Sequence, residues 1–214
     1  YQNVIDPQTG YARGRLANGD FIPNFDPYNF AWYITEGYPV HYSWYVPHDI
    51  PGLMAKMGGE QRFCLKLDSM FMQSRYWHGN EPSHQIPFMF NYTAEVWKTQ
   101  QYVPQILETE YKDLPGGLSG NDDAGQMSAW YVFSAMGFFP VCPGRPLYDL
   151  GSPIFGKVTI HLPNEKKFII NDLLETMIER CKHLGLLNSM PEQQAILKIS
   201  IYVTALIMNY VHTG

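Results

Sequence analysis

The sequence predicts a mainly α-helical domain that is followed by a β-hairpin and then by a helical C-terminal tail. Apolar residues recur at helical spacing in one segment after another, and polar, Gly-rich loops separate these segments. Near residue 157 the pattern changes to an alternation of apolar and polar residues, and beyond residue 170 it returns to helical spacing. At 214 residues the chain is long enough to bury a substantial core.

The beginning of the chain is predicted to contain little regular structure. Residues 1–30 are rich in Asn, Asp, Pro and Gly, which indicates an extended loop with short turns. Residues 31–45 are rich in aromatic side chains. From Pro51 onward, apolar residues recur at helical spacing on both sides of Gly58 and Gly59. We therefore expect two short helices that meet at these glycines.

Helical spacing continues through the middle of the chain. Residues 84–94 and 96–111 both carry a helical pattern, with Thr93 as the expected cap of the second helix. The Pro115–Gly117 cluster ends this run, and residues 126–136 are predicted to form the next helix. One face of that helix is expected to consist of Met127, Trp130, Tyr131, Ser134 and Ala135.

Residues 148–170 are predicted to contain the β-hairpin. Val158, Ile160 and Leu162 alternate with polar residues, and a turn at Pro163–Asn164 leads into a second apolar run. The helical part before this region, residues 1–147, is therefore treated as a unit of its own.

Residues 171–214 are expected to form an atypical tail of two amphipathic helices. The last apolar stretch is interrupted by Lys198 and by several polar residues. Because a membrane span needs about 20 largely uncharged residues, a buried helix is favoured and no membrane span is expected.

Composition excludes some classes of protein. The formal net charge is −5, the isoelectric point is near 5.8, and Lys and Arg form no cluster, so nucleic acid is not expected as a partner. Aromatic residues make up 15% of the chain, which fits either a thick core or clefts in which sugar rings stack on aromatic rings. Cys64, Cys142 and Cys181 form no C-x-x-C pair and are interpreted as small buried residues. The N-terminus shows no secretory signal pattern, and we interpret the sequence as part of a longer protein.

Acidic residues in predicted loops are the strongest chemical signal. They are Glu36, Asp49, Glu81 and the pair Asp122 and Asp123. Hydrolysis of a glycosidic bond needs one carboxylic acid and a second carboxylate, and a rigid helical scaffold can aim such loop residues into one cleft. Two alternatives stay open: helix caps or solvated turn residues, and oxygen ligands of Ca²⁺.

Histidine and serine patterns point to no other chemistry. The histidines in the same loops lack the spacing of a zinc site, so each is interpreted as a satisfied or a substrate-bonding imidazole. These histidines are His41, His48, His78 and His84. Ser43 and Ser83 stand outside any G-x-S-x-G motif, which excludes an acyl hydrolase of that type.

The order of several long motifs resembles glycoside hydrolase family 92, a family of calcium-dependent, inverting exo-α-mannosidases. The motifs are TEGYPVHYSWYVPHD, HGNEPSH and GNDDAGQMSAWYVFSAMGFFPVCPG. The resemblance runs from Tyr1 to about Ile170. It implies an N-terminal β-sandwich joined to an (α/α)₆ barrel, with the site at their junction. Residues 1–147 would then be part of that barrel.

The resemblance also implies roles for individual residues. Glu36 is expected to be the general acid, and Asp123 the general base with Asp122 as the second choice. Asp123 and Glu81 are the expected ligands of Ca²⁺. Substrate contacts are expected from Trp44, His48, Asp49, His78, Asn80, Glu81 and His84. The implied substrate is a mannose-containing oligosaccharide or N-glycan, and the implied location of the full-length parent is secreted or periplasmic.

The residues themselves agree with this division of labour. Trp32, Tyr33, Tyr38 and Tyr42 stand near Glu36 in the sequence, and apolar neighbours favour the protonated form that a general acid needs. Asp123 stands on a different loop, which leaves room for the water that an inverting mechanism requires.

The chain differs from the family motif at a few positions. Tyr38, Val40 and His41 follow Glu36 where the family commonly has Asn, Trp and Gln, and Gln85 replaces a second His. These differences support an alternative, a carbohydrate-binding remnant of such an enzyme without turnover. A structural helical-repeat protein is a third reading, and the lack of any fixed period argues against it.

Overall fold

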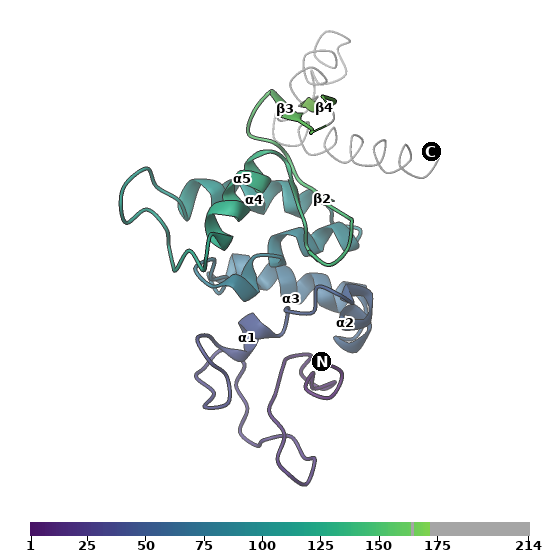
Figure 1. The fold of residues 1–214 in the computed structure, drawn as a ribbon. Helices are drawn as coiled ribbons and strands as arrows, with labels where there is room; N and C mark the ends of the chain where they lie inside the picture. Colours follow the sequence, from purple (N-terminus) through teal and green to yellow (C-terminus); the bar gives the residue numbers. More distant parts are fainter. Residues whose placement is uncertain (164, 172–214) are drawn as a thin grey trace, which may run out of the picture.

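The computed structural model describes residues 1–163 and 165–171. This part of the chain is mainly helical, as predicted. The α-helices are α1 (Pro39–Tyr42), α2 (Ile50–Lys56), α3 (Glu60–Met72), α4 (Trp97–Thr109) and α5 (Gln126–Ala135), and the 3₁₀ helices are η1 (Glu81–Ser83) and η2 (Ile86–Tyr92). Figure 1 shows these elements stacked in chain order, from the N-terminal segment at the bottom to α4 and α5 above.

The N-terminal segment is an extended loop, as predicted, and it is anchored to the helices. Isolated bridges pair Ile5 with Ala12 and Arg15 with Phe21. The backbone N–H of Ala12 donates to the hydroxyl of Ser43 just after α1, with an N···O distance of 2.7 Å. This contact ties the first loop to the segment that carries α1.

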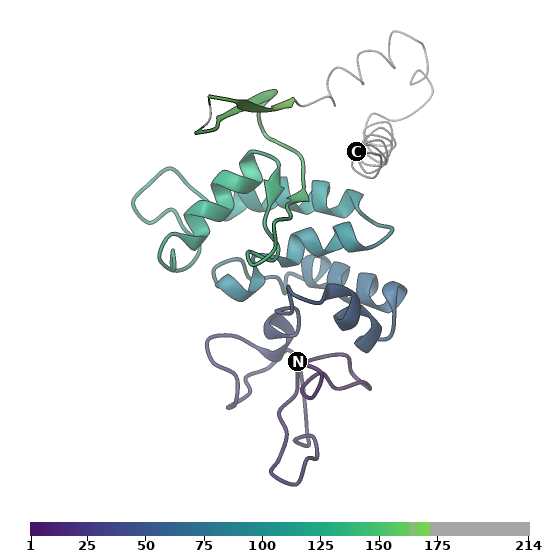
Figure 2. The ribbon, with the colours of Figure 1, turned by 45° about the vertical axis from the view of Figure 1, so that its right-hand side comes forward.

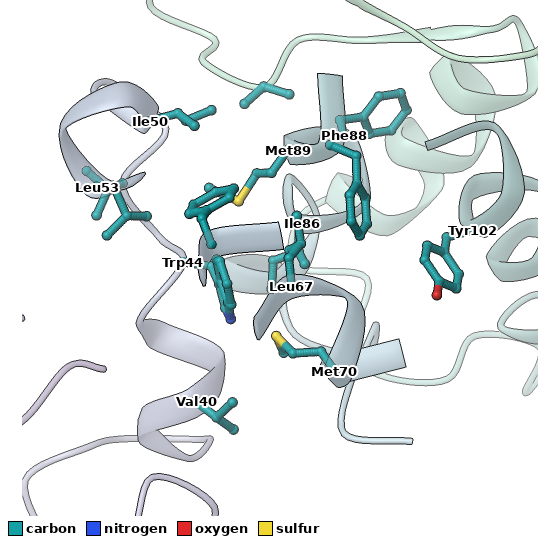
Figure 3. Close-up of a cluster of buried hydrophobic side chains, with 14 of the residues drawn as sticks. Val40, Trp44, Ile50, Leu53, Leu67, Met70, Ile86, Phe88, Met89 and Tyr102 are labelled. Atoms are coloured by element: carbon teal, nitrogen blue, oxygen red, sulfur yellow. The ribbon is translucent and has the colours of Figure 1, made fainter. Parts of the chain in front are cut away.

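The core lies between α1, α3 and η2 (Figure 3). Trp44 is fully buried at its centre, and the Trp44 and Phe63 rings meet edge to face with centroids 5.2 Å apart. Burial of large aromatic side chains of this kind contributes strongly to stability. Leu67 and Met70 on α3 close the other side of the core. The predicted pair of helices that meets at Gly58 and Gly59 is confirmed, since α2 ends just before and α3 begins just after these residues.

The predicted helix over residues 84–94 is the 3₁₀ helix η2 instead, and the shorter 3₁₀ helix η1 precedes it. Pro82 and Pro87 stand in the first turns of η1 and η2, where a helix tolerates proline. Thr93 is not the cap of α4, whose first flanking residue is Val96 without a side-chain cap. The Thr93 hydroxyl donates to the Phe90 carbonyl instead and so ends η2.

Two short strands were not predicted. β1 (Phe138–Phe139) pairs antiparallel with β2 (Asp149–Leu150) directly after α5. Strands of two residues are too short to produce a periodic pattern in the sequence. The predicted face of α5 is confirmed: Met127, Trp130, Ser134 and Ala135 are buried, and Tyr131 is half-buried.

The predicted hairpin is confirmed as β3 (Lys157–His161) and β4 (Lys167–Asn171). Val158 opposes Ile170 and Ile160 opposes Phe168. Figures 1 and 2 show the hairpin beyond α5, at the end of the molecule opposite the N-terminal segment. The turn residue Asn164 and the tail predicted over 171–214, apart from Asn171 in β4, lie outside the described residues.

Two further expectations concern the cysteines and the membrane span. Cys64 is buried, as predicted, whereas Cys142 is half-buried. In residues 1–163 and 165–171, no helix combines the length and the apolar character needed to cross a membrane.

Candidate active site

The segment 77–84 is the centre of the candidate site. It contains the HGNEPSH motif, and its residues His78, Asn80 and His84 are buried. Two loops that carry predicted catalytic carboxylates lie against it, one before α1 and one before α5. Contacts with this segment therefore position those two loops.

Both ring nitrogens of His78 are hydrogen-bonded inside the protein. Nε2 lies 2.7 Å from the hydroxyl of Tyr111, which itself donates to the Met127 carbonyl at 2.9 Å. Nε2 must therefore carry the proton, and Nδ1 accepts from the Tyr76 hydroxyl at 2.7 Å. Burial lowers the pKa of His78 to about 2, and the neighbouring His84 ring adds to this effect. His78 is thus a neutral, buried link between α5 and the segment after α3.

His84 is held in the same way. Its Nε2 lies 3.0 Å from the His78 carbonyl, which can only accept, so Nδ1 is free to accept from the Gln126 amide at 3.3 Å. The Trp130 indole N–H donates to the His84 carbonyl at 2.8 Å. Burial lowers the pKa of His84, and both the bond to His78 and the nearby Asp123 carboxylate oppose this shift. The first turn of α5 is therefore fixed to the segment 77–84, with Asp123 close to the His84 ring.

Glu36 lies on a sharp turn before α1. Its φ angle is +70°, in the left-handed region that costs a non-glycine residue free energy. The side chain is exposed and lines a cavity of about 760 Å³. Aromatic and apolar side chains provide most of the cavity wall, among them Tyr28, Phe30, Tyr38, Tyr76 and Trp77.

The predicted aromatic enclosure of Glu36 is only partly formed. Tyr38 lines the same cavity, but the Trp32 side chain is 75% exposed and does not contribute to its wall. Burial raises the pKa of the neighbouring Tyr42, the Asn80 amide opposes the rise, and the Glu36 carboxylate adds to it. Glu36 is therefore close to Tyr42 and open to solvent.

The loop before α5 separates the roles of its two aspartates. Asp122 Oδ1 accepts from both the backbone N–H and the hydroxyl of Ser128, at 3.0 and 2.9 Å. Asp122 thus caps the first turn of α5, which is the structural alternative raised for this pair. Asp123 is exposed, and its φ angle is +48°, followed by +56° at Ala124 and +97° at Gly125. Such a run of left-handed residues holds the Asp123 side chain away from the helix cap.

The two carboxylate loops meet at the segment 77–84. Gly79 and Gly120 approach so closely that a side-chain carbon on Gly79 would lie 2.7 Å from the Ser119 carbonyl oxygen. On the other side, α1 packs against η1. Asp123 does not line the cavity of Glu36. In the described structure the two carboxylates are joined through this segment rather than through one shared cavity wall.

Three residues of the predicted substrate site occupy structural positions. Trp44 is fully buried in the core and presents no surface to a sugar. Asp49 caps α2, since its Oδ1 accepts from the Gly52 N–H at 3.0 Å and its Oδ2 from the Tyr1 hydroxyl at 2.6 Å. His48 is exposed, and its ring contacts the Tyr1 ring.

Oxygen donors of the kind that Ca²⁺ prefers stand around the segment 77–84. Asp123 and Glu81 are exposed carboxylates, and the buried Ser83 hydroxyl has no hydrogen-bond partner. The Asn80 side-chain nitrogen lies near Tyr42, but it makes no hydrogen bond of normal geometry. Within residues 1–163 and 165–171, no three His, Cys, Asp or Glu side chains converge on one point. The donors are of the right chemistry, but they are fewer than a complete Ca²⁺ shell.

The structure adds residues that the sequence reasoning missed. Arg75 and Trp77 line the cavity of Glu36, and the Arg75 guanidinium lies over the Tyr28 ring, 3.4 Å from its centroid. Trp77 directly precedes the HGNEPSH motif, so its position next to the motif could have identified it as a candidate site residue. Arg75 and Tyr28 stand outside every recognised motif.

The scaffold is mainly helical, Glu36 lies in an aromatic-lined cavity, and Asp123 lies on a second loop that meets the same segment 77–84. Two loop carboxylates of this kind fit the needs of glycoside hydrolysis. The chain belongs to glycosyl hydrolase family 92, because the sequence profile of the family's catalytic domain matches residues 1–204. The match continues past Ile170. The expected end of the resemblance at about Ile170 is therefore wrong.

Solved structures and a further relative agree with this assignment. A GH92 α-mannosidase from Bacteroides thetaiotaomicron is 41% identical, with a TM-score of 0.74 over 80% of this chain and 24% of that chain. An inverting GH92 mannosidase from Bacteroides thetaiotaomicron VPI-5482 is 36% identical, with a TM-score of 0.74 over 80% of this chain and 26% of that chain. A secreted glycosidase from Arthroderma benhamiae is 33% identical over 119 residues, which are 56% of this chain and 15% of the relative. This chain thus spans about a quarter or less of these relatives.

Proposed function

We propose that this chain is part of the catalytic domain of an exo-acting α-mannosidase, which removes terminal α-linked mannose from oligosaccharides or N-glycans. The observation that carries the proposal is the placement of Glu36 and Asp123. Both are exposed carboxylates in left-handed backbone conformations, and the loops that hold them lie against the same buried segment. Strained residues of this kind persist where the surrounding structure holds them, and they cluster at active sites.

In this proposal Glu36 protonates the departing glycosidic oxygen, and Asp123 accepts a proton from the attacking water. An inverting enzyme needs about 6.5–9.5 Å between these two carboxyl groups, so that the water fits between the base and the sugar. Two loops on either side of the segment 77–84 suit that requirement better than neighbouring residues would. The similarity to an inverting mannosidase supports inversion here as well.

Asp123 and Glu81 are proposed to take part in holding Ca²⁺, which would bind sugar hydroxyls when present. Both are oxygen donors, as a hard cation requires, and the unpartnered Ser83 hydroxyl adds a neutral oxygen nearby. The remaining ligands of a shell of about six to eight oxygens would be backbone carbonyls, waters or residues outside this chain. His78 and His84 act behind this site by fixing the backbone of the segment 77–84 and the start of α5.

We also propose that residues 1–147 form part of an (α/α)₆ barrel in the complete protein. The described helices α2 to α5 follow one another with loops between them, as successive helices of such a barrel would. The relative described as a secreted glycosidase supports a secreted or periplasmic location for the complete protein.

A carbohydrate-binding remnant without turnover is the second candidate function. One observation favours it: Glu36 is exposed to solvent rather than enclosed by Trp32. The substitutions at Tyr38, Val40 and His41 fall next to this residue. A remnant would bind mannosides through the aromatic cavity but leave the glycosidic bond intact.

The test is the release of mannose from an α-linked mannobiose by the complete protein, before and after treatment with a calcium chelator. The proposed function predicts release that falls on chelation and returns when Ca²⁺ is added. Glu36→Gln in the same protein should lower release by about 100-fold or more, because general acid catalysis contributes about 10²–10⁴-fold. Binding of mannobiose without any release would favour the remnant.

A further inference from the structure

His41 stands at the third position of α1 and bridges two segments that are distant in the sequence. Its Nδ1 accepts from the Tyr38 backbone N–H at 3.1 Å, and its Nε2 lies 3.1 Å from the Arg75 carbonyl. An N–H can only donate and a carbonyl can only accept, so the ring is neutral with its proton on Nε2. One imidazole therefore joins the turn of Glu36 to the chain that leaves α3.

The bond to Tyr38 has the geometry of a capping box. In that motif the side chain at the third helical position accepts from the backbone N–H of the residue before the helix, and Glu or Gln usually fills the position. Here Tyr38 is the residue before α1, and His41 provides the acceptor. Unlike Glu, His41 also has an N–H donor, Nε2, on the opposite side of its ring, and this N–H donates to the Arg75 carbonyl.

The turn fits closely around the ring. A side-chain carbon on Gly37 would lie 3.1 Å from His41 Nδ1, which is closer than an ordinary contact, so glycine lets the turn approach the imidazole without displacing it. The Tyr38 ring stacks on the His41 ring with centroids 5.6 Å apart, and the Trp77 ring contacts it at 5.9 Å. The His41 side chain is buried, with 6% of the residue exposed. Burial lowers the pKa of His41, and the bond to Arg75 opposes this shift.

We infer that His41 is a positioning residue for Glu36, the proposed acid. The His41 ring fixes the strained turn that carries Glu36 against the cavity wall formed by Arg75, Tyr76 and Trp77. This inference rests on the proposed function of Glu36. The φ angle of +70° at Glu36 is unfavourable, and the turn keeps it only if its ends are held. His41 holds the end two residues downstream. The charged groups on the same cavity are Glu36 itself and Arg75, and the ring bonds to Arg75 through its backbone carbonyl.

The test compares two variants of the complete protein. His41→Phe keeps a planar ring but loses both hydrogen bonds. His41→Gln keeps one acceptor and one donor on neighbouring atoms, so it can make both bonds again. His161→Phe, on the exposed face of β3, is the matched control for the introduction of an apolar ring.

Two readouts are measured. His41→Phe is expected to lower kcat for α-mannobiose by about 10- to 100-fold with KM changed less than about threefold, because a small misplacement of a catalytic group costs up to about 10²-fold. His41→Gln is expected to restore kcat to within about threefold of the wild type. Amide hydrogen exchange at Tyr38 should become faster in His41→Phe and return toward the wild-type rate in His41→Gln.

The exchange readout does not depend on mannosidase activity. If the wild-type protein releases no mannose, the proposed function fails while the exchange rates still test the role of His41. Unchanged exchange at Tyr38 in His41→Phe would overturn the inference. So would a loss of kcat in His41→Phe that His41→Gln does not repair, because a general loss of packing rather than the two hydrogen bonds would then be the cause.

Discussion

At the scale of single residues, the two adjacent aspartates before α5 have different proposed roles. The Asp122 carboxylate is occupied by two hydrogen bonds from Ser128, whereas the Asp123 side chain is exposed and lies near His84. A helix cap can be exchanged for another at moderate cost, but a general base cannot. Substitutions at Asp122 and Asp123 can therefore be compared to separate an effect on stability from an effect on catalysis.

We predict opposite effects for the two substitutions. Asp122→Ala should lower the stability of the protein by about 0.5–2 kcal/mol, as the loss of a helix cap does, and should leave measurable mannose release. Asp123→Asn should lower mannose release by about 100-fold or more with little change in thermal midpoint, because Asn tolerates the left-handed backbone of this position. Thermal unfolding and the mannobiose assay on the same samples provide both values. If Asp123→Asn kept wild-type turnover, Asp123 would have no part in the mechanism.

The residues alone did not separate a helix cap from a general base at this pair, and only the family resemblance favoured Asp123 over Asp122 as the base. Carboxylates in Gly- and Pro-rich loops can be recognised directly in the sequence. In the structure, Glu36, Glu81 and Asp123 are all exposed at the candidate site. The direction in which a side chain points is set by contacts far away in the chain. Asp49 serves as a cap because Tyr1 and Gly52 reach it. Trp44 is at the core because Phe63 packs on it.

At the scale of elements, β2 is joined to η2 through a half-buried carboxyl group. The Tyr92 hydroxyl at the end of η2 donates to Asp149 Oδ2 at 3.1 Å, and the Asn91 amide donates to the Leu150 carbonyl at 2.8 Å. Burial raises the pKa of Asp149 to about 6, and the hydrogen bond from Tyr92 opposes the rise. The fold therefore prefers the protonated form of Asp149.

This preference predicts a pH dependence of stability. Because the pKa in the folded state lies above the ordinary value of about 4, the contribution of Asp149 to stability is complete below pH 4. This contribution is lost as the pH rises through 6, where the half-buried carboxyl group ionises. Asp149→Asn stays neutral, so its thermal midpoint should gain on that of the wild type between pH 4 and pH 7.5. Midpoints measured at several pH values in this range test it, and a constant difference between the two proteins would contradict the assignment.

The elements were predicted where the sequence carries a long period. α3, α4 and α5 each present several turns of apolar spacing, β3 alternates over five residues, and β4 contains a short apolar run. Two details differ from the prediction. η2 is a 3₁₀ helix where an α-helix was predicted over residues 84–94. The pairing of β1 with β2 depends on contacts with η2 that no local pattern records.

At the scale of the whole molecule, the elements are stacked in chain order (Figure 1). The site forms where segments that are distant in the sequence meet. The segment 77–84 reaches the loop before α5 through Gly79 and Gly120, and it reaches α1 through η1. His78, His84 and Trp130 lock the first of these contacts by hydrogen bonds. The candidate site thus depends on long-range contacts, although most of the fold depends on near neighbours.

The same arrangement gives a prediction for the complete protein. A cation that binds Asp123 and Glu81 in the folded state alone stabilises that state by mass action. The gain is about 2.7 kcal/mol when free Ca²⁺ exceeds its dissociation constant about 100-fold. We therefore expect Ca²⁺ to raise the thermal midpoint of chelator-treated protein, in steps that follow its concentration.

The contribution of Asp123 to this effect can be isolated with a matched control. Asp123→Asn replaces a charged oxygen ligand with a neutral amide, so the rise in midpoint with Ca²⁺ should shrink or shift to higher concentrations. Asp149→Asn removes a carboxyl group on β2, which is hydrogen-bonded to Tyr92 rather than to the segment 77–84, and should keep the full rise. A midpoint of the wild type that does not respond to Ca²⁺ would remove calcium from the proposal. An equal loss of response in both variants would show that overall charge, rather than Asp123 as a ligand, produces the effect.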